Sequence, residues 1–218
     1  AIDLADWVIN AGSRIVFPTI QLLMTLLLTM IASIVLGMGL PSIPCYIITS
    51  TMAAPILLGT PLFREVMGTP ETAIFVAHMF VFYFGIFANI TPPVALAAFA
   101  AAGVSGGDPN RTGFAAIKLA LAGFLVPFLF AFAPELLLIN AGLSTVWTVI
   151  SAFLGVFMLS TAVEGYWYRE LPAWLRLIVG VSAVLLIYPS FYTDLAGLAA
   201  LVLLVWAAWW PTHRAAAM

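Results

Sequence analysis

The sequence predicts an all-α protein that crosses a membrane several times. Of its 218 residues, 64% are hydrophobic and only 7% are charged, whereas a soluble domain carries about 25% charged residues. Several uncharged apolar runs reach about 20 residues, which is the length an α-helix needs to cross a bilayer. Seven Lys and Arg against nine Asp and Glu give no basic surface for nucleic acid. We therefore expect a polytopic protein that contacts membrane lipid and binds no nucleic acid.

The first apolar run covers residues 15–36 and leads into Gly37-Met38-Gly39-Leu40-Pro41-Ser42-Ile43-Pro44, after which a second run ends near residue 58. Glycine and proline at this density end a helix. No charged residue lies between Arg14 and Arg64, which disfavours a loop in water. The pattern predicts a re-entrant hairpin over about residues 15–58, in which two helices enter from one side and meet at a buried tip. A short loop between two spanning helices is the simpler alternative.

The second interruption is Asn89-Ile90-Thr91-Pro92-Pro93, inside an apolar stretch of about residues 71–103. Each proline disfavours a helical conformation at the residue before it, so the helix must open around Thr91. The small residues that follow, mostly alanines, allow another helix to come close. We expect a discontinuous helix, with a proline-kinked spanning helix as the alternative.

The rest of the chain predicts about four ordinary spanning helices. Lys and Arg occur in alternate connections, near Arg111, near Arg169 and after the last helix, and the positive-inside rule places these parts and the C-terminus in the cytoplasm. The sequence thus divides into transport elements over residues 1–112 and spanning helices over residues 113–218. The four helices are expected over residues 113–134, 143–163, 174–188 with an extension to 191, and 195–210.

The two interrupted segments form the candidate site. A pair of Gly/Pro-interrupted helices indicates the ion and substrate site of a secondary transporter. Freed carbonyls, hydroxyls and amides are neutral oxygen donors that can replace the hydration shell of Na⁺, and the N-termini of the helices after the interruptions suit a carboxylate. The candidate binding residues are Ser33, Gly37, Gly39, Pro41, Ser42, Asn89, Thr91, Pro92 and Pro93, of which Gly37, Gly39, Asn89 and Thr91 would bind Na⁺.

Cofactor chemistry and catalysis find little support. The lone Cys45 and the separated His78 and His213 lack the spacing of a metal site. We expect no cofactor besides Na⁺ as a coupling ion, and we interpret His78 as a hydrogen-bonded packing residue in preference to a proton carrier. An intramembrane enzyme using His78, Ser33, Ser42 and Asn89 is disfavoured because no nucleophile and base lie at helical spacing. A structural membrane subunit without a solute site is the main alternative.

Three segments of the chain resemble the fused membrane component of tripartite ATP-independent periplasmic (TRAP) transporters of the TAXI type. They are residues 37–41, residues 89–100 and the run Gly107-Asp108-Pro109-Asn110-Arg111-Thr112-Gly113. The resemblance covers about residues 15–134. It implies an elevator-type, Na⁺-coupled importer of small organic anions in the bacterial inner membrane, supplied by a periplasmic substrate-binding protein. Residues 37–41 would then be the tip of the second hairpin, and residues 89–93 the break in the second repeat.

The same resemblance implies a missing partner. Such permeases contain two inverted repeats, and this sequence, which begins at Ala1 instead of Met, matches only the second. We therefore expect it to be the C-terminal part of a longer permease, with the N-terminal half supplying the rest of the transport site.

Overall fold

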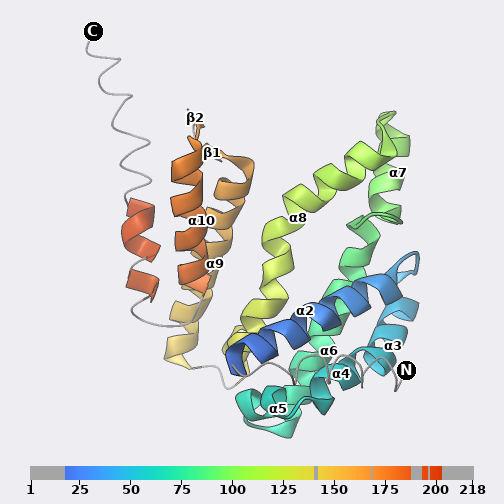
Figure 1. The fold of residues 1–218 in the computed structure, drawn as a ribbon, viewed down its shortest axis with the longest axis vertical. Helices are drawn as coiled ribbons and strands as arrows, with labels where there is room; N and C mark the ends of the chain where they lie inside the picture. The colour runs from blue at the N-terminus through green and yellow to red at the C-terminus, as the bar shows by residue number, and fades with distance from the viewer. Residues whose placement is uncertain (1–17, 140–141, 168, 188–192, 196, 203–218) are drawn as a thin grey trace. The chain divides into compact units, whose positions relative to one another are not determined.

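The computed structural model describes residues 18–139, 142–167, 169–187, 193–195 and 197–202. These residues form helices joined by turns, apart from one pair of two-residue strands, so the predicted all-α class is confirmed for them. The chain divides into two units, residues 1–118 and 119–218, and each is described by itself (Figure 1). Five described helices are long and apolar enough to cross a membrane: Ile20–Gly37, Ser42–Gly59, Pro70–Ile90, Pro109–Phe132 and Thr145–Glu164.

The first unit begins with a helical hairpin. Helix α2 (Pro18–Gly37) is followed by a tight turn and then by α3 (Ser42–Met52) and α4 (Ala54–Gly59). The turn contains Gly39 at φ 77°, a left-handed conformation that glycine adopts without steric cost. The second arm is interrupted at Ala53 because Pro55 has no N–H to continue the helical hydrogen bonds. A helix–turn–helix thus stands where the sequence predicted the hairpin.

A short helix, α5 (Pro61–Met67), follows the hairpin. The sequence analysis assigned no element to this connection. The helix begins with a proline at its first turn, a position where the missing N–H is not needed. Phe63 and Met67 are buried and anchor α5 in the core of the first unit.

The long apolar stretch that follows is divided, with a break where the prolines predict one. Helix α6 (Pro70–Phe87) is capped by Thr69, whose hydroxyl accepts a hydrogen bond from Thr72 N at 3.2 Å. It passes into the short 3-10 helix η1 (Ala88–Ile90), and α7 (Leu96–Ser105) begins only after five further residues. Figure 1 shows this interruption in the green part of the chain.

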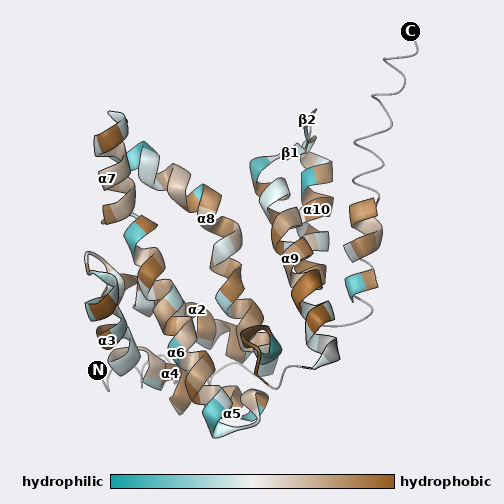
Figure 2. Ribbon diagram, turned by 180° about the vertical axis from the view of Figure 1, so that it is seen from behind, coloured by the Kyte–Doolittle hydropathy of each residue, from teal (hydrophilic) through white to brown (hydrophobic). Residues whose placement is uncertain are grey.

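Helix α6 is the centre of the first unit, because α2, α3, α4 and α5 all pack against it. Its fully buried Phe80 and Phe84 stack edge to face, with ring centroids 4.9 Å apart. The outward faces stay apolar, as the exposed side chains of Ile31, Ile47 and Phe75 illustrate; Figure 2 shows hydrophobic residues on all of these helices, with polar residues between them. Such faces are suited to lipid and not to water.

Helix α8 (Pro109–Phe132) begins four residues earlier than predicted. Asp108 caps it, since its Oδ1 accepts a hydrogen bond from Arg111 N at 2.8 Å, and a proline at the first helical position is favoured. Arg111 therefore lies inside this helix, which corrects the prediction that it belongs to the connection before it.

The second unit contains η2 (Pro134–Leu137), α9 (Leu143–Glu164) and α10 (Ala173–Ile187), with strands β1 (Tyr166–Trp167) and β2 (Arg169–Glu170) between the last two helices. The sequence analysis assigned that connection as a loop. Arg176 lies within α10, and its guanidinium donates hydrogen bonds to the carbonyls of Ala162 and Val163 at 3.0 and 2.9 Å. It thereby pairs carbonyls at the end of α9 that have no partner within their own helix.

Two predicted helices of this unit are only partly described. Helix α10 has 15 residues and so is about 22 Å long, shorter than a membrane span, and its predicted extension to residue 191 lies outside the described residues. A short apolar helix covers Thr193–Val202. The remainder of the predicted fourth helix, to residue 210, also lies outside the described residues.

Candidate functional site

The structure brings the hairpin turn against the break after α6. A Cβ atom placed on Gly39 would lie 3.6 Å from Val94 Cγ1, which is ordinary van der Waals distance. Helix α2 also contacts η1. The two interruptions that the sequence pairs are therefore neighbours in space, although about fifty residues separate them along the chain.

Glycines on α2 and α6 make this approach possible. A Cβ on Gly37 would lie 2.7 Å from Gly85 O and 2.9 Å from Cys45 Sγ, and one on Gly85 would lie 2.7 Å from the same sulfur. Three helices thus meet where two of them present no side chain. No role for Gly85 was predicted from the sequence, although a glycine inside a helix costs about 1 kcal/mol relative to alanine and is a signal of close packing.

A polar stripe on α2 leads to this junction. Gln21, Thr25, Thr29, Ser33 and Gly37 follow one another every four residues, and Thr25, Thr29 and Ser33 are almost completely buried. Each hydroxyl donates to the carbonyl four residues earlier, at 3.0, 2.8 and 2.8 Å. The Ser33 hydroxyl is therefore engaged with Thr29 inside the helix pair, one turn before the hairpin turn.

At the break, the backbone carbonyl of Asn89 has no hydrogen-bond donor, because prolines follow it. The residues three and four positions after Asn89 are Pro92 and Pro93, and neither has an N–H. Among the described residues, no backbone N–H donates to Asn89 O. The Asn89 side chain is half-buried, and its amide makes no hydrogen bond with another described residue. Asn89 therefore offers two oxygens that no protein group in the described part of the chain uses.

Thr91 shapes the other side of the break. Its hydroxyl donates to Phe87 O at 2.7 Å, and its carbonyl accepts from Ala95 N at 3.2 Å. The Pro92–Pro93 peptide bond is cis, and the buried Ala95 has φ 35° in the left-handed region. The hydroxyl oxygen of Thr91 keeps lone pairs for a further ligand while its hydrogen is held by the helix.

Two helices have their N-termini at these interruptions. Helix α3 starts after Pro41 and α7 after Ala95, and neither residue caps its helix through a side chain. The first N–H groups of such helices have no partner within the helix and carry partial positive charge. Ser42 and Pro93 are exposed at these starts, and Gly39 is exposed at the turn between the two arms. The arrangement can bind an anion through backbone N–H groups.

Other carbonyl oxygens that were predicted to bind Na⁺ or substrate already accept hydrogen bonds within the protein. Gly37 O accepts a hydrogen bond from Leu40 N at 3.3 Å, and Pro41 O accepts one from Cys45 N at 3.0 Å. No group of three or more His, Cys, Asp or Glu that could bind a metal ion occurs among the described residues. Neutral oxygens and N–H groups are thus the chemistry that the two interruptions provide.

Helix α8 also packs against the break after α6, at Gly113. A Cβ placed on it would lie 3.2 Å from Pro92 Cγ and 3.6 Å from Phe99 Cε1. Gly113 belongs to the run of residues 107–113 that carries the family resemblance, but no role for it was predicted from the sequence. Its signal was again a glycine inside a helix, which is destabilising unless a neighbour needs the space.

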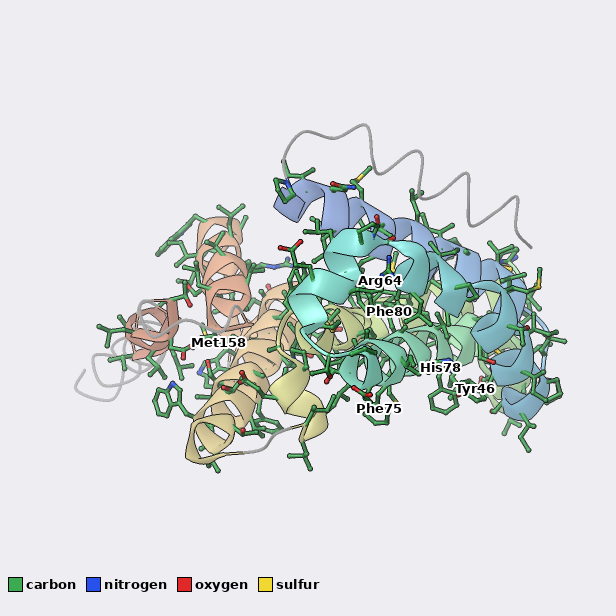
Figure 3. The ribbon with its side chains drawn as sticks, turned by 90° about the horizontal axis from the view of Figure 1, so that it is seen from below. Tyr46, Arg64, Phe75, His78, Phe80 and Met158 are labelled. Carbon is green, nitrogen blue, oxygen red and sulfur yellow. The ribbon has the colours of Figure 1, made fainter. Side chains whose placement is uncertain are left out.

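His78 lies apart from these oxygens and has a structural partner. Its Nδ1 is 3.0 Å from Tyr46 Oη, and the Tyr46 ring packs edge to face on Phe82 with centroids 5.4 Å apart. Figure 3 shows Tyr46 and His78 side by side, on α3 and α6. This confirms the hydrogen-bonded histidine that the sequence analysis favoured.

Tyr46→Phe tests that role. The change removes the hydroxyl partner of His78 while the ring contact remains, so we expect a loss of at most about 1 kcal/mol in the free energy of unfolding and unchanged solute uptake. Thermal unfolding and vesicle uptake of the same preparation measure both. A large drop in uptake at an unchanged Tm would assign the pair to transport instead.

A comparison with models of known protein families matches most of the chain. The family model described as "Tripartite ATP-independent periplasmic transporter, DctM component" matches residues 1–144. The matched range contains the hairpin, the break and α8. No curated protein and no solved structure matches the chain significantly.

Proposed function

The chain belongs to the DctM component family of tripartite ATP-independent periplasmic transporters, and from this premise we propose that it binds Na⁺ and a small organic anion between the hairpin turn and the break after α6. Members of this family are multi-pass transporters of the bacterial inner membrane, not enzymes, and work with a periplasmic binding protein. Family membership thus excludes the intramembrane enzyme considered from the sequence.

The observation that carries the proposal is the free carbonyl of Asn89. In a low-dielectric setting, an unpaired carbonyl is costly unless water or a cation occupies it. Together with the Asn89 amide and the Thr91 hydroxyl oxygen, it forms a set of neutral oxygens of the kind that coordinates Na⁺. The bound cation then lowers the electrostatic cost of an anion at the helix N-termini beside it.

The substrate is a carboxylate on this proposal. The open N-termini of α3 and α7 supply N–H groups and partial positive charge, which suit an anion. No Asp, Glu, Lys or Arg lies between Arg14 and Arg64 or between Glu71 and Asp108, so no fixed charge of these segments competes for either ligand. The N-terminal half of the permease, carrying the first repeat, supplies the opposite wall.

The remaining features follow the TAXI-type resemblance. The hairpin of α2, α3 and α4 is re-entrant, with its turn at membrane depth, and the unit containing it moves as an elevator against a fixed scaffold. The N-terminal end of α8, the connection near Arg169 and the C-terminus face the cytoplasm. The apolar outward faces of the helices support a lipid-exposed unit.

Thr91→Val combined with Gly39→Leu tests the site. The first change removes a proposed Na⁺ ligand at nearly constant volume, and the second forces a side chain into a left-handed turn, at about 1–2 kcal/mol, next to Val94. We expect Na⁺-dependent uptake of small carboxylates to be abolished in vesicles supplied with the binding protein. The readout is uptake driven by a Na⁺ gradient compared with a K⁺ gradient.

Thr51→Val is the matched control. The hydroxyl of Thr51 also donates to a carbonyl four residues earlier, at 2.8 Å, but it lies on the exposed side of α3. This variant should transport normally, and Thr91→Ser should retain most uptake because it keeps the oxygen. Unchanged uptake in the double variant would instead support a structural subunit without a solute site.

A further inference from the structure

The connection between α9 and α10 in the second unit packs closely on the end of α9. Its two strands pair antiparallel, and Figure 1 shows them at the end of α9 where α10 begins. Successive residues of a strand point to opposite faces. Trp167 therefore turns inward, where its ring packs edge to face on Phe157 with centroids 5.3 Å apart. Tyr166 points outward and is 58% exposed.

Two further contacts fix this connection on the helix pair. Leu171 is buried in the hydrophobic core between α9 and α10, and its backbone N–H donates to Gly165 O at 2.8 Å. The guanidinium of Arg176 lies against the same glycine, since a Cβ placed on Gly165 would be 2.7 Å from Arg176 Cζ. The outward side chains of the connection are therefore held at a defined height relative to both helices.

The charged residues of these two helices are gathered at the same end. Helix α9 has no Asp, Glu, Lys or Arg before Glu164, and α10 has none after Arg176. Both residues, and Glu170 between them, are exposed. Helix α9 has 22 residues and is about 33 Å long, close to the ~30 Å hydrocarbon core of a bilayer. When α9 crosses the membrane, its charged end therefore reaches one membrane surface.

The outward face of α10 is apolar directly beyond this end. Its exposed large side chains are Trp174, Leu177, Ile178, Val181 and Val184. The small residues of α10 face α9 instead: Ala183 is fully buried, and a Cβ placed on Gly180 would be 3.7 Å from Ala162 Cβ. Helices that pack together in membranes approach each other through small residues. A face of large apolar side chains on a membrane-spanning unit is therefore suited to lipid.

We infer that Tyr166 and Trp174 bind the headgroup region of the phospholipid bilayer and fix the depth of the second unit in the membrane. Each side chain joins an apolar ring to one polar group, the combination that concentrates Tyr and Trp at membrane–water boundaries. Both lie where the exposed charged residues end and the apolar face of α10 begins. Phosphate and ester oxygens of the lipid accept hydrogen bonds from the Tyr166 hydroxyl and the Trp174 indole, while acyl chains cover α10. This surface is outside the proposed transport site, so the two proposals stand or fall separately.

Spin labels along one side of α10 test this placement in the transporter reconstituted into phospholipid vesicles. Ala173→Cys, Leu177→Cys and Val181→Cys place labels at exposed positions four residues apart, so that each lies about 6 Å further along the helix. Collision of the label with O₂, which concentrates in lipid, relative to collision with a water-soluble nickel chelate should rise at each step. Val179→Cys is the control, because Val179 is fully buried and its label should meet neither reagent.

Two other patterns would overturn the inference. Low collision with both reagents along the whole series, as at Val179, would mean that protein covers this face of α10. High collision with the nickel chelate at all three positions would mean that the face lies in water.

The aromatic side chains are tested in the same vesicles. The difference in fluorescence between the unmodified protein and Trp174→Phe reports the emission of Trp174. Lipids brominated close to the headgroup should quench this emission more strongly than lipids brominated at the end of the acyl chain, and the reverse order, or no quenching by either lipid, contradicts headgroup binding. Tyr166→Ala with Trp174→Ala should change the ratio of O₂ to nickel collisions at the Leu177→Cys label. The exchange Tyr166→Trp with Trp174→Tyr should leave that ratio unchanged. An unchanged ratio in the double alanine variant would show that the two rings do not fix the depth of the unit.

Discussion

Gly37→Ala is expected to destabilise the first unit by about 1–3 kcal/mol and to reduce uptake with it. The added Cβ would lie 2.7 Å from Gly85 O, a backbone atom of a helix that four other helices contact. Backbone at the centre of a packed unit cannot move aside as the end of a flexible side chain can. The α2 and α6 helices must therefore separate, and the hairpin turn moves away from the break. Thermal unfolding in detergent measures the effect.

Gly103→Ala is its control. Gly103 lies inside α7, and a Cβ placed there would meet no atom within 4 Å. The same chemical change should leave the Tm unchanged or raise it slightly, because alanine favours a helix by about 1 kcal/mol over glycine. Equal Tm values for the two variants would contradict the close approach of α2 and α6. Cys45→Ala added to Gly37→Ala should recover little, since the clash with the Gly85 carbonyl remains.

Gly113→Leu is expected to abolish Na⁺-dependent uptake while the protein still folds. A Cβ at this position already lies 3.2 Å from Pro92 Cγ, so the rest of a leucine side chain must displace the segment around Pro92 or tilt α8. Either movement shifts the Asn89 carbonyl and the Thr91 hydroxyl relative to the hairpin turn. Misplacing binding groups by about 1 Å is enough to lose function on the order of 10²-fold. Uptake and Tm are measured on the same preparation.

Ala115→Leu provides the comparison for this change. Ala115 is on the same helix, two residues further on, and is exposed, so a leucine there adds apolar surface without meeting Pro92. It should transport normally and keep its Tm. If Gly113→Leu transports as well as Ala115→Leu, the packing of α8 against the break has no part in the site.

Most of the helical segments could be predicted because their causes are local. The lengths of the apolar runs predict the five long helices, and the missing N–H groups of Pro92 and Pro93 predict the break. Helix starts were less accurate: α8 begins at Pro109 because Asp108 caps it, a short-range hydrogen bond that hydropathy does not detect. The connection after Glu164 also contains two short strands where a loop was expected.

The residues of the candidate site and their chemistry stay a prediction, and the structure adds two glycines on which the packing around them depends. Asn89 and Thr91 follow from the prolines after them. Gly85 and Gly113 were missed, because a glycine in an apolar helix indicates a close neighbour without saying which one. Outside this site, the burial of Asp194 was not predicted either, because its hydrogen-bond partners Trp147 and Ser151 precede it by more than forty residues.

The sequence alone therefore determined that this chain is helical, lies in a membrane and opens a helix around Thr91, because these depend on composition and on bonds between residues near in sequence. Only the tertiary structure decided that the hairpin turn meets the break, that Gly37 rests on Gly85, and that Leu186 O and Asp194 Oδ1 both lie within hydrogen-bonding distance of the Ser151 hydroxyl. Those contacts depend on which helix faces pack together, and side chains far apart in the chain select the faces by the space and the hydrogen bonds that they offer.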